Sequence, residues 1–556
     1  MQVGPQCWTC FRGRVLCDGG FPACSTCKRH GVQCPGYDGA GDANVVRGDG
    51  GDATLKVSTP ESSASYEELG MELAHFTSDH ALKPTTTRSP VFHQPTPALY
   101  RKAQMIFEGL DYFNQMICPD LVSLESHFNP YKVNLQGVDK IPDIYVKVLV
   151  SVASFHRLMS VGPDPTPSSA LIQKDTDVFQ LRVEALQGLN EQLSSPDQQT
   201  SDATLLCVLS LMVASIQASA YTEWRVHLEG ARRIIQLRGG LKKIITVNPY
   251  FKPVLTFFML IDVMGATTTP SSHADMPLAC NMAMKYWEVE PSVFQLIATT
   301  CIPCPDVLFR VLILVNYLRT VTFKENLRVR RQSGTKMAIE KVMSFSPAEY
   351  SARMQQFKGW SLSGKEVGFD TSHESPQTVS SSSPSLDKQS SADSSPATHS
   401  SPRSDGDLWL SVGVTYRAST LLYTFHTLVF DCEDDASMLL PDNIQINVVD
   451  LRQETFEILY SAMVPVFADP VSLHQIGKLI MWPLFILGME TDYRNVHVRS
   501  FVTSSFLTLS HVLGIMSPIG IINELETKWR IDDEQGPGAH VKWDDYLQGR
   551  EDFIVF

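Results

Sequence analysis

Apolar residues recur at intervals of three and four over two long stretches, from about residue 97 to 359 and from about 408 past 512. One example is the run Ile106, Leu110, Phe113 and Ile117. This spacing places apolar side chains on one face of an α-helix, and strand-like alternation is scarce. The pattern therefore predicts a large all-α domain.

One helix is especially clear between residues 222 and 240. Its apolar face holds Trp224, Leu228, Ala231 and Ile235. The pair Gly239 and Gly240 follows, and glycine is the residue that most often ends a helix. We therefore expect an amphipathic core helix that stops at this pair.

Residues 38–95 lack this periodicity and are rich in Gly, Asp, Ser, Thr and Pro, so we interpret them as a flexible linker. Within them, residues 65–76 carry a capping-box pattern and an apolar face made by Tyr66, Leu69, Leu73 and Phe76. We interpret this island as a short helix docked on the main domain. A fragment of dimerising coiled coil and an acidic partner-binding helix are the alternatives.

A second stretch without periodicity, residues 365–407, is rich in serine and predicts a disordered insertion, because it offers too little apolar surface to fold. Four of its serines precede proline: Ser375, Ser383, Ser395 and Ser401. We interpret the tract as an unmodified spacer, with phosphorylation of these serines as the alternative. The end of the chain, residues 543–556, mixes acidic and bulky apolar residues. It fits a transactivating tail and a segment packed on the domain equally well.

Charge confines any nucleic-acid contact to one end of the chain. The 556 residues carry a formal net charge of -14, yet residues 1–40 hold four basic and only two acidic side chains. An acidic body does not adhere to DNA or to an anionic membrane. The most apolar run, residues 205–218, is too short to span a bilayer, so no membrane contact is expected. Because no secretory signal opens the sequence, its cysteines are expected in a reducing compartment.

Six of the twelve cysteines lie within 28 residues, with gaps of 2, 6, 6, 2 and 6: Cys7, Cys10, Cys17, Cys24, Cys27 and Cys34. Clustered cysteines in a reducing compartment bind metal more often than they form disulfides, so a disulfide knot is the weaker alternative. A tetrahedral zinc site needs four ligands. Six thiolates therefore suffice for two zinc ions only if two sulfurs bridge the metals.

This array resembles the fungal binuclear zinc-cluster family, whose five gaps it matches, and Pro22 stands where that family usually has a proline. The resemblance implies that Cys7 and Cys24 bridge two zinc ions, that Cys10 and Cys17 complete one site, and that Cys27 and Cys34 complete the other. Each half is expected to carry a short helix near its C-x2-C pair. Such a module binds double-stranded DNA at CGG-like triplets.

Four basic side chains are the candidate DNA contacts. Arg14 is expected to read guanine, because its planar guanidinium group can donate two hydrogen bonds, one to O6 and one to N7 of the base. Arg12, Lys28 and Arg29 suit phosphate contacts. The alternative for Arg12 and Arg14 is charge compensation of the cluster. The stretch is less basic than is usual in the family, with Leu16 directly before the third cysteine, so we keep as a second hypothesis a coregulator that acts through protein contacts without binding DNA.

A separate resemblance covers most of residues 100–530. Residues 224–240 resemble the W-x2-HL-x-GA pattern, closing in RGG, of the regulatory domain that accompanies many fungal zinc clusters. Residues 481–490 resemble the WPLFxxG stretch of the same family. Together the two resemblances imply a nuclear transcription factor that acts on RNA polymerase II genes, often of secondary metabolism. Its expected partners are DNA, the transcription machinery and a second copy of the chain.

The expected organisation is a small binuclear zinc-cluster module followed by a large all-α regulatory domain. The module spans residues 1–37, the linker 38–95, the first helical part 96–364, the insertion 365–407 and the second helical part 408–556. No catalytic constellation is found, so an enzyme is not expected. The pair Cys301 and Cys304 is interpreted as structural, with a thiol switch as the alternative.

Overall fold

The computed structural model describes residues 25–29, 97–124, 129–160, 169–221, 223–289, 297, 300–321, 325–362, 405–430, 439–441, 447–492, 494–536 and 541–556. The chain divides into two compact units, residues 1–79 with 161–177, and residues 80–160 with 178–556. Of the smaller unit, only residues 25–29 and 169–177 are described. The linker 38–95 and nearly all of the serine-rich insertion lie outside the described residues.

The larger unit is built from helices. Its first part contains α3 (Pro97–Tyr112), η1 (Phe113–Ile117), η2 (Cys118–Leu121), η3 (Leu135–Lys140), α4 (Asp143–Ser160), α5 (Ser169–Ser194), α6 (Asp202–Ala218), α7 (Glu223–Leu237), α8 (Leu241–Val247), η4 (Pro249–Phe251) and α9 (Lys252–Thr267). It continues with α10 (Met276–Met284), η5 (Lys285–Glu288), α12 (Asp306–Thr320), α13 (Glu325–Ser344) and α14 (Pro347–Leu362). Helix α5 begins in the smaller unit and ends in the larger one.

The second part begins at α15 (Asp405–Thr424), three residues inside the predicted insertion. It continues with η6 (Phe425–Phe430), α17 (Val448–Ala468), α18 (Pro470–Ile476), η7 (Gly477–Ile480), α19 (Met481–Glu490), α20 (Val496–Leu513), α21 (Ser517–Gln535) and α22 (Trp543–Leu547). Two isolated β-bridges are the only extended pairings among the described residues. The predicted fold class is thus confirmed for the large domain.

Local sequence signals set several helix boundaries. The Ser201 side chain accepts a hydrogen bond from the Thr204 backbone at the start of α6, and Asn447 caps α17 in the same way. These caps satisfy backbone N–H groups that have no partner inside a helix. At the other end of a helix, Gly514 follows α20 with φ of 59°, a conformation that glycine adopts without strain.

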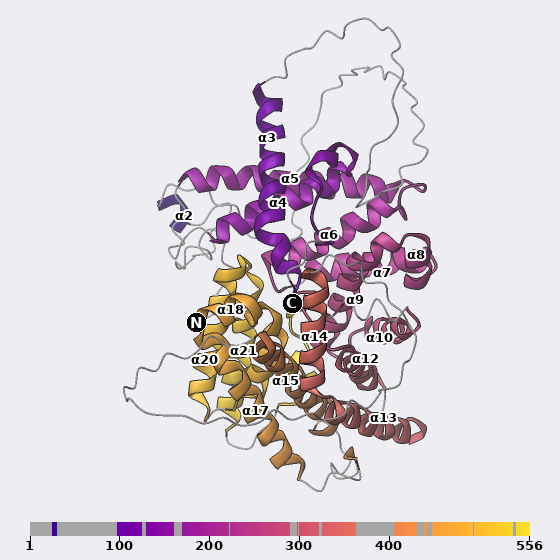
Figure 1. Ribbon diagram of the computed structural model, residues 1–556, viewed down its shortest axis with the longest axis vertical. Coiled ribbons are helices and arrows are strands. Elements are labelled where there is room, and N and C mark those ends of the chain that lie inside the picture. Colours follow the sequence, from indigo (N-terminus) through magenta and orange to yellow (C-terminus); the bar gives the residue numbers. More distant parts are fainter. Residues whose placement is uncertain are drawn as a thin grey trace, which may run out of the picture. The chain divides into compact units, whose positions relative to one another are not determined.

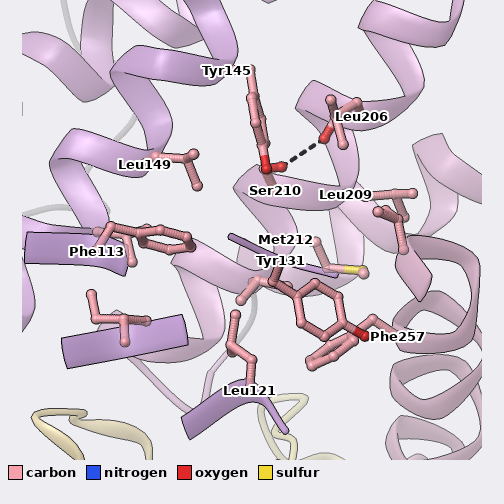
Figure 2. A pocket seen from close by; sticks show the side chains of 14 residues that line it. Phe113, Leu121, Tyr131, Tyr145, Leu149, Leu206, Leu209, Ser210, Met212 and Phe257 are labelled. Carbon is pink, nitrogen blue, oxygen red and sulfur yellow. Dashed lines mark hydrogen bonds between the residues drawn. The ribbon is translucent and has the colours of Figure 1, made fainter. Parts of the chain in front are cut away.

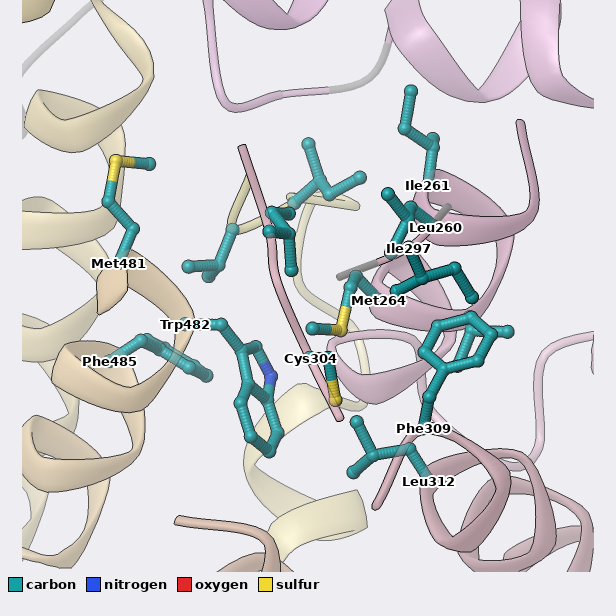
Figure 3. Close-up of a cluster of buried hydrophobic side chains, with 14 of the residues drawn as sticks. Leu260, Ile261, Met264, Ile297, Cys304, Phe309, Leu312, Met481, Trp482 and Phe485 are labelled. Carbon is teal, nitrogen blue, oxygen red and sulfur yellow. The ribbon is translucent and has the colours of Figure 1, made fainter. Parts of the chain in front are cut away.

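The two helical parts share one hydrophobic core. Helix α15 packs against α14, α17 and α19 (Figure 1), so helices on either side of the serine-rich insertion are neighbours. Figure 3 shows part of the core, where Met264 of α9, Phe309 of α12 and Trp482 of α19 converge. Because the same cluster contains residues from Leu110 to Val555, the two helical parts contribute to one main core, beside which Ala266, Met276 and Cys280 form a small separate cluster.

Two helical stretches, Pro249–Thr267 and Pro470–Glu490, are long and apolar enough to cross a membrane by length and composition alone. Both are longer than the run 205–218, on which the sequence-based expectation of no membrane contact rests. In the structure, 78% and 72% of their most apolar windows are buried inside the protein. Helices at the centre of a hydrophobic core have the same composition, and these two belong to the core just described.

Candidate functional site

The described part of the cysteine array is a single short helix, α2 (Ser25–Arg29). In sequence it follows Cys24 directly, and it contains Cys27, the second cysteine of the second C-x2-C pair. The predicted short helix near this pair is therefore confirmed. Lys28 and Arg29 form its last turn and both are exposed, as phosphate-contacting side chains must be.

The other predicted site residues lie outside the described residues: Cys7, Cys10, Cys17, Cys24, Cys34, Arg12 and Arg14. The ligand roles of all six cysteines and the DNA contacts of all four basic residues, Lys28 and Arg29 included, therefore stay predictions. The chemistry of the donor set fits zinc, because six thiolates at this spacing are the soft, deprotonated ligands that zinc prefers.

The cysteines described in the larger unit, the helical unit, lie in a different environment from the one expected for the N-terminal cysteine array. All five are free thiols, and all but Cys301 are fully buried: Cys118, Cys207, Cys280, Cys301 and Cys304. Burial raises the pKa of each thiol, to about 12 for Cys207 and well above the ordinary value for Cys304. A protonated thiol is a poor metal ligand and a poor nucleophile. Among the described residues, no group of three His, Cys, Asp or Glu side chains is placed to hold a metal ion.

The thiol-switch alternative for Cys301 and Cys304 is not supported. Burial also raises the pKa of Cys301 to about 12, so neither thiol is primed for oxidation at neutral pH. The segment between them is tied down by the Tyr350 hydroxyl, which donates a 2.7 Å hydrogen bond to the Pro303 carbonyl. The pair is structural, as first interpreted.

The signature helix α7 matches its prediction in detail. The four residues of its predicted apolar face are at most 1% exposed: Trp224, Leu228, Ala231 and Ile235. At its end, Gly240 N donates to Ile235 O at 2.8 Å and Gly239 N donates to Gln236 O at 3.0 Å. This is the Schellman arrangement, and both glycines have φ near 90°. The RGG ending is thus a helix stop.

The polar side chains of α7 serve packing. Arg232 is buried and pairs with Asp262 of α9, which also accepts a 2.5 Å hydrogen bond from the Tyr286 hydroxyl. His227 is half-buried, and burial together with the nearby Arg182 lowers its pKa to about 4. His227 is therefore neutral at pH 7 and packed against its neighbours.

The WPLFxxG stretch forms α19, whose ten residues are all buried. Trp482 Nε1 donates to Thr267 Oγ1 at 3.2 Å, and its ring meets the Tyr423 ring edge-on at 5.9 Å. A side chain at Gly488 would meet Leu525 at 2.7 Å, so glycine permits the close approach of α21. The motif therefore encodes helix packing at the centre of the domain.

The chain end is an interior element, which decides between the two alternatives left open for it. Trp543 and the run Phe553–Val555 are fully buried. The Ile554 backbone donates to Ala220 O at 2.9 Å, and Trp543 Nε1 donates to Thr267 O at 2.9 Å. Residues 541–556 are thus a segment packed on the domain and not an exposed transactivating tail.

Sequence reasoning missed two buried polar networks. In one, the Arg319 guanidinium donates to Asp544 Oδ1 at 2.6 Å and to the Tyr423 hydroxyl at 2.8 Å. In the other, His426 Nδ1 lies 2.5 Å from one Glu490 oxygen, and Arg452 Nε donates to the other at 2.7 Å. The only local signal was the helical spacing of the apolar residues around Asp544: Trp543, Tyr546 and Leu547.

Comparisons with known proteins agree with both parts of the chain. Residues 6–42 match the fungal Zn(2)-Cys(6) binuclear cluster domain, and residues 108–556 match the fungal specific transcription factor domain. A relative from Leptosphaeria maculans is named "Phomenoic acid biosynthesis cluster-specific transcriptional regulator". It is 22% identical over 537 residues, which cover 94% of this chain and 85% of the relative. No solved structure matches the chain.

Proposed function

The chain belongs to the family of fungal specific transcription factors, with an N-terminal Zn(2)-Cys(6) cluster domain, and from this premise we propose that it recognises a specific double-stranded DNA sequence in the nucleus. The observation that carries the proposal is the spacing of the six cysteines, which agrees with the match of residues 6–42. The family points to a transcription regulator rather than an enzyme.

In this proposal the six cysteines hold two zinc ions per chain, with Cys7 and Cys24 as the bridging ligands. Bound zinc supplies most of the folding free energy of the module, because so short and polar a segment cannot bury a sufficient hydrophobic core. The cysteines hold the two halves of the module in a fixed relative orientation. Each half then presents the first turn of its short helix to the DNA major groove.

Sequence recognition is assigned to Arg14, which reads a guanine of a CGG-like triplet. The exposed Lys28 and Arg29 of α2, together with Arg12, contact phosphates and position the module without reading sequence. One triplet gives little discrimination against a genome of competing sites, so two copies of the chain are needed to read two half-sites.

The proposed targets are RNA polymerase II genes of a metabolic or secondary-metabolite pathway, on which the bound protein contacts the transcription machinery. The support is the relative from Leptosphaeria maculans, whose name describes a cluster-specific regulator of a biosynthesis. Mapping of occupied sites across the genome tests this part. Occupancy concentrated at one group of neighbouring biosynthetic genes is expected, and occupancy scattered without such a group contradicts it.

Selection of bound sequences from random double-stranded DNA, with the full chain at low salt, tests the recognition itself. An enriched motif containing a CGG-like triplet is expected. Absence of any enriched motif would favour the coregulator hypothesis instead, provided that native mass spectrometry finds two zinc ions on the chain.

Matched variants separate the proposed roles of the basic residues. Arg14→Ala should lower discrimination at one base pair by about 1–3 kcal/mol. Lys28→Ala should weaken binding to all sequences alike and reduce the salt dependence by about one counterion. Both variants should keep two zinc ions. If Arg14→Ala instead loses zinc and leaves the motif unchanged, Arg14 compensates the charge of the cluster.

A further inference from the structure

The helical unit contains an apolar hollow, shown in Figure 2. Its walls include Phe113 and Ile117 of η1, Leu149 of α4, Leu209 and Met212 of α6, and Phe257 of α9. All six side chains point at the hollow from elements of one unit. None of them belongs to the cysteine array, and none is used by the proposed DNA recognition.

One wall of the hollow is an irregular piece of backbone. Residues 113–117 form a π-helical turn between α3 and η2. Turns of this kind are rare and frequently occur at functional sites. The turn is held by Asn114, whose amide donates to Val133 O at 2.8 Å and whose oxygen accepts from Val133 N at 2.7 Å. These bonds keep Phe113 and Ile117 at the wall of the hollow.

The size of the hollow selects the kind of occupant. Its free volume is about 90 Å³. This is smaller than an apolar cavity of about 150 Å³ that binds benzene. It is also below the range of sites for drug-sized ligands, about 300–1,000 Å³, so only a small molecule fits. A helix, about 10 Å across, is too wide to enter.

The polarity of the lining residues further restricts which ligand the hollow can bind. No charged side chain is among the described residues that line it. Ser210 donates its hydroxyl to Leu206 O at 2.8 Å and keeps its oxygen free to accept. Figure 2 shows the Tyr145 ring extending toward Ser210, and the Tyr145 hydroxyl makes no hydrogen bond with the described residues. The hollow therefore offers apolar walls and one hydrogen-bonding end.

We propose that this hollow binds a neutral, mainly hydrocarbon small molecule with a single hydroxyl or carbonyl group, which hydrogen-bonds at Tyr145 and Ser210. The hydrocarbon part fills the space between Phe113, Leu209 and Phe257. If the chain regulates transcription as proposed above, this molecule is an effector of the regulator. Binding to the hollow itself does not depend on that premise.

Straight-chain 1-alkanols from propanol to decanol are the probe, and saturation-transfer NMR titrations on the full chain without DNA measure their dissociation constants. The dissociation constant should fall about fourfold for each added methylene until the hollow is filled, and then level off. Carboxylates of the same length should bind at least about tenfold more weakly, because the residues that line the hollow offer no positive charge to the carboxylate. Absence of saturable binding, or a gain that never levels off, overturns the proposal.

Variants locate the site. Val213→Trp places a large ring into the hollow and should weaken hexanol binding at least about tenfold. Val226→Trp, at a position 71% exposed on α7, is the matched control and should bind as wild type. Equal binding by Val213→Trp and wild type overturns the assignment.

If Val213→Trp fails to fold, the conservative pair Tyr145→Phe and Ser210→Ala decides. Together they should weaken hexanol about five- to tenfold and leave binding of hexane unchanged, because only the alcohol uses the hydrogen bonds. Equal loss for both probes overturns the hydrogen-bonding role.

The effector role has its own readout. Reporter output from the selected DNA motif should change at least about twofold when the alkanol is added to cells with the wild-type chain. It should stay constant with Val213→Trp. Saturable binding without any change in output overturns the effector role alone. Failure to select a DNA motif overturns the proposed function and leaves the binding result standing.

Discussion

At the scale of single residues, the buried guanidinium of Arg319 makes polar contacts with four other residues. Its side chain is fully buried, and it donates to Asp544, to the Tyr423 hydroxyl, and to the carbonyls of Ala266 and Thr269. Tyr423 is buried and the Asp544 side chain is 30% exposed, so the hydrogen bonds from Arg319 replace bonds that water would otherwise supply. The residue therefore joins the end of the chain to the core helices.

Replacing Arg319 with methionine should reduce the free energy of unfolding by about 3 kcal/mol, because it leaves two carbonyls and the partly buried Asp544 carboxylate without their donor. Urea unfolding followed by circular dichroism measures the loss. Arg530→Met is the control, since Arg530 and Glu534 form a pair that is 65% and 66% exposed. An exposed pair contributes less than about 1 kcal/mol. Similar losses in the two variants would show that the Arg319 network does not stabilise the fold.

The same ion pair makes stability depend on pH. Burial by itself raises the pKa of Asp544, but the Arg319 charge and hydrogen bonds from Ser271 outweigh it, so the pKa lies below the ordinary value. A carboxylate with a lowered pKa stabilises the fold above its unfolded pKa, about 3.9, and this contribution is lost as the pH falls through the folded pKa. Stability should therefore decrease below about pH 4.

The variant Asp544→Asn isolates this effect. The difference in unfolding free energy between wild type and Asp544→Asn should be largest at pH 7 and should shrink as the pH falls below about 4. Asp545→Asn, at the exposed neighbouring position, is the control at pH 7 and should change stability little. A difference for Asp544→Asn that is constant across this pH range would contradict the assigned ionic role.

At the scale of elements, the boundary of α7 depends on backbone conformation more than on contacts. Gly240 has φ of 92°, and a Cβ at that position would meet nothing within 4 Å. The strain on any other residue there comes from the backbone alone. Gly240→Ala should therefore destabilise the domain by about 1–2 kcal/mol, which thermal unfolding measures.

A second glycine provides the comparison for that prediction. Gly137 also has open space around its Cβ position, with no atom closer than 3.9 Å, but its φ is -112°. Alanine adopts this conformation without strain, so Gly137→Ala should change stability by less than about 0.5 kcal/mol in either direction. If Gly240→Ala also leaves the stability of the domain unchanged, the glycine pair does not determine where α7 ends.

Helix α7 also shows which elements can be predicted from sequence. Its apolar face and its terminating glycines are properties of 17 consecutive residues, 224–240, so local pattern suffices. The terminal segment, residues 543–556, has no local pattern of this kind. Asp544 meets Arg319 across 225 residues of sequence, and nothing near either residue indicates the other. For this reason a packed segment and an exposed tail fitted the sequence equally well.

At the scale of the whole molecule, the zinc site and the apolar hollow differ in the same way: a local sequence pattern marks the first and not the second. The zinc site is readable because its ligands repeat at fixed short spacing over residues 7–34. The hollow could not be predicted in this way, because its walls come from five elements, η1, η2, α4, α6 and α9, and one wall depends on a π-helical turn held by Asn114 and Val133. Its residues look like ordinary core positions in the sequence. Only the folded arrangement leaves the space unfilled.

The division into two units leads to a prediction about metal removal. The cysteine array lies in one unit, and the helical core lies in the other. If zinc supplies the folding free energy of the module, a chelator should abolish sequence-specific DNA binding and release two zinc ions per chain. The helical core contains no cluster of metal ligands among its described residues, so it should keep its structure.

Far-UV circular dichroism and thermal unfolding, recorded before and after chelation, check this separation. The helical signal should fall by only a few per cent, and the unfolding temperature of the large domain should shift by less than about 2 °C, because binding energy at one unit stabilises only the unit that binds. Readdition of zinc should restore DNA binding. Cys27→Ser should reproduce the chelated state without a chelator, and Cys207→Ser should retain both zinc and DNA binding, since Cys207 is a buried thiol of the helical core. Collapse of the whole helical signal on chelation would mean that the zinc module and the regulatory domain fold as one.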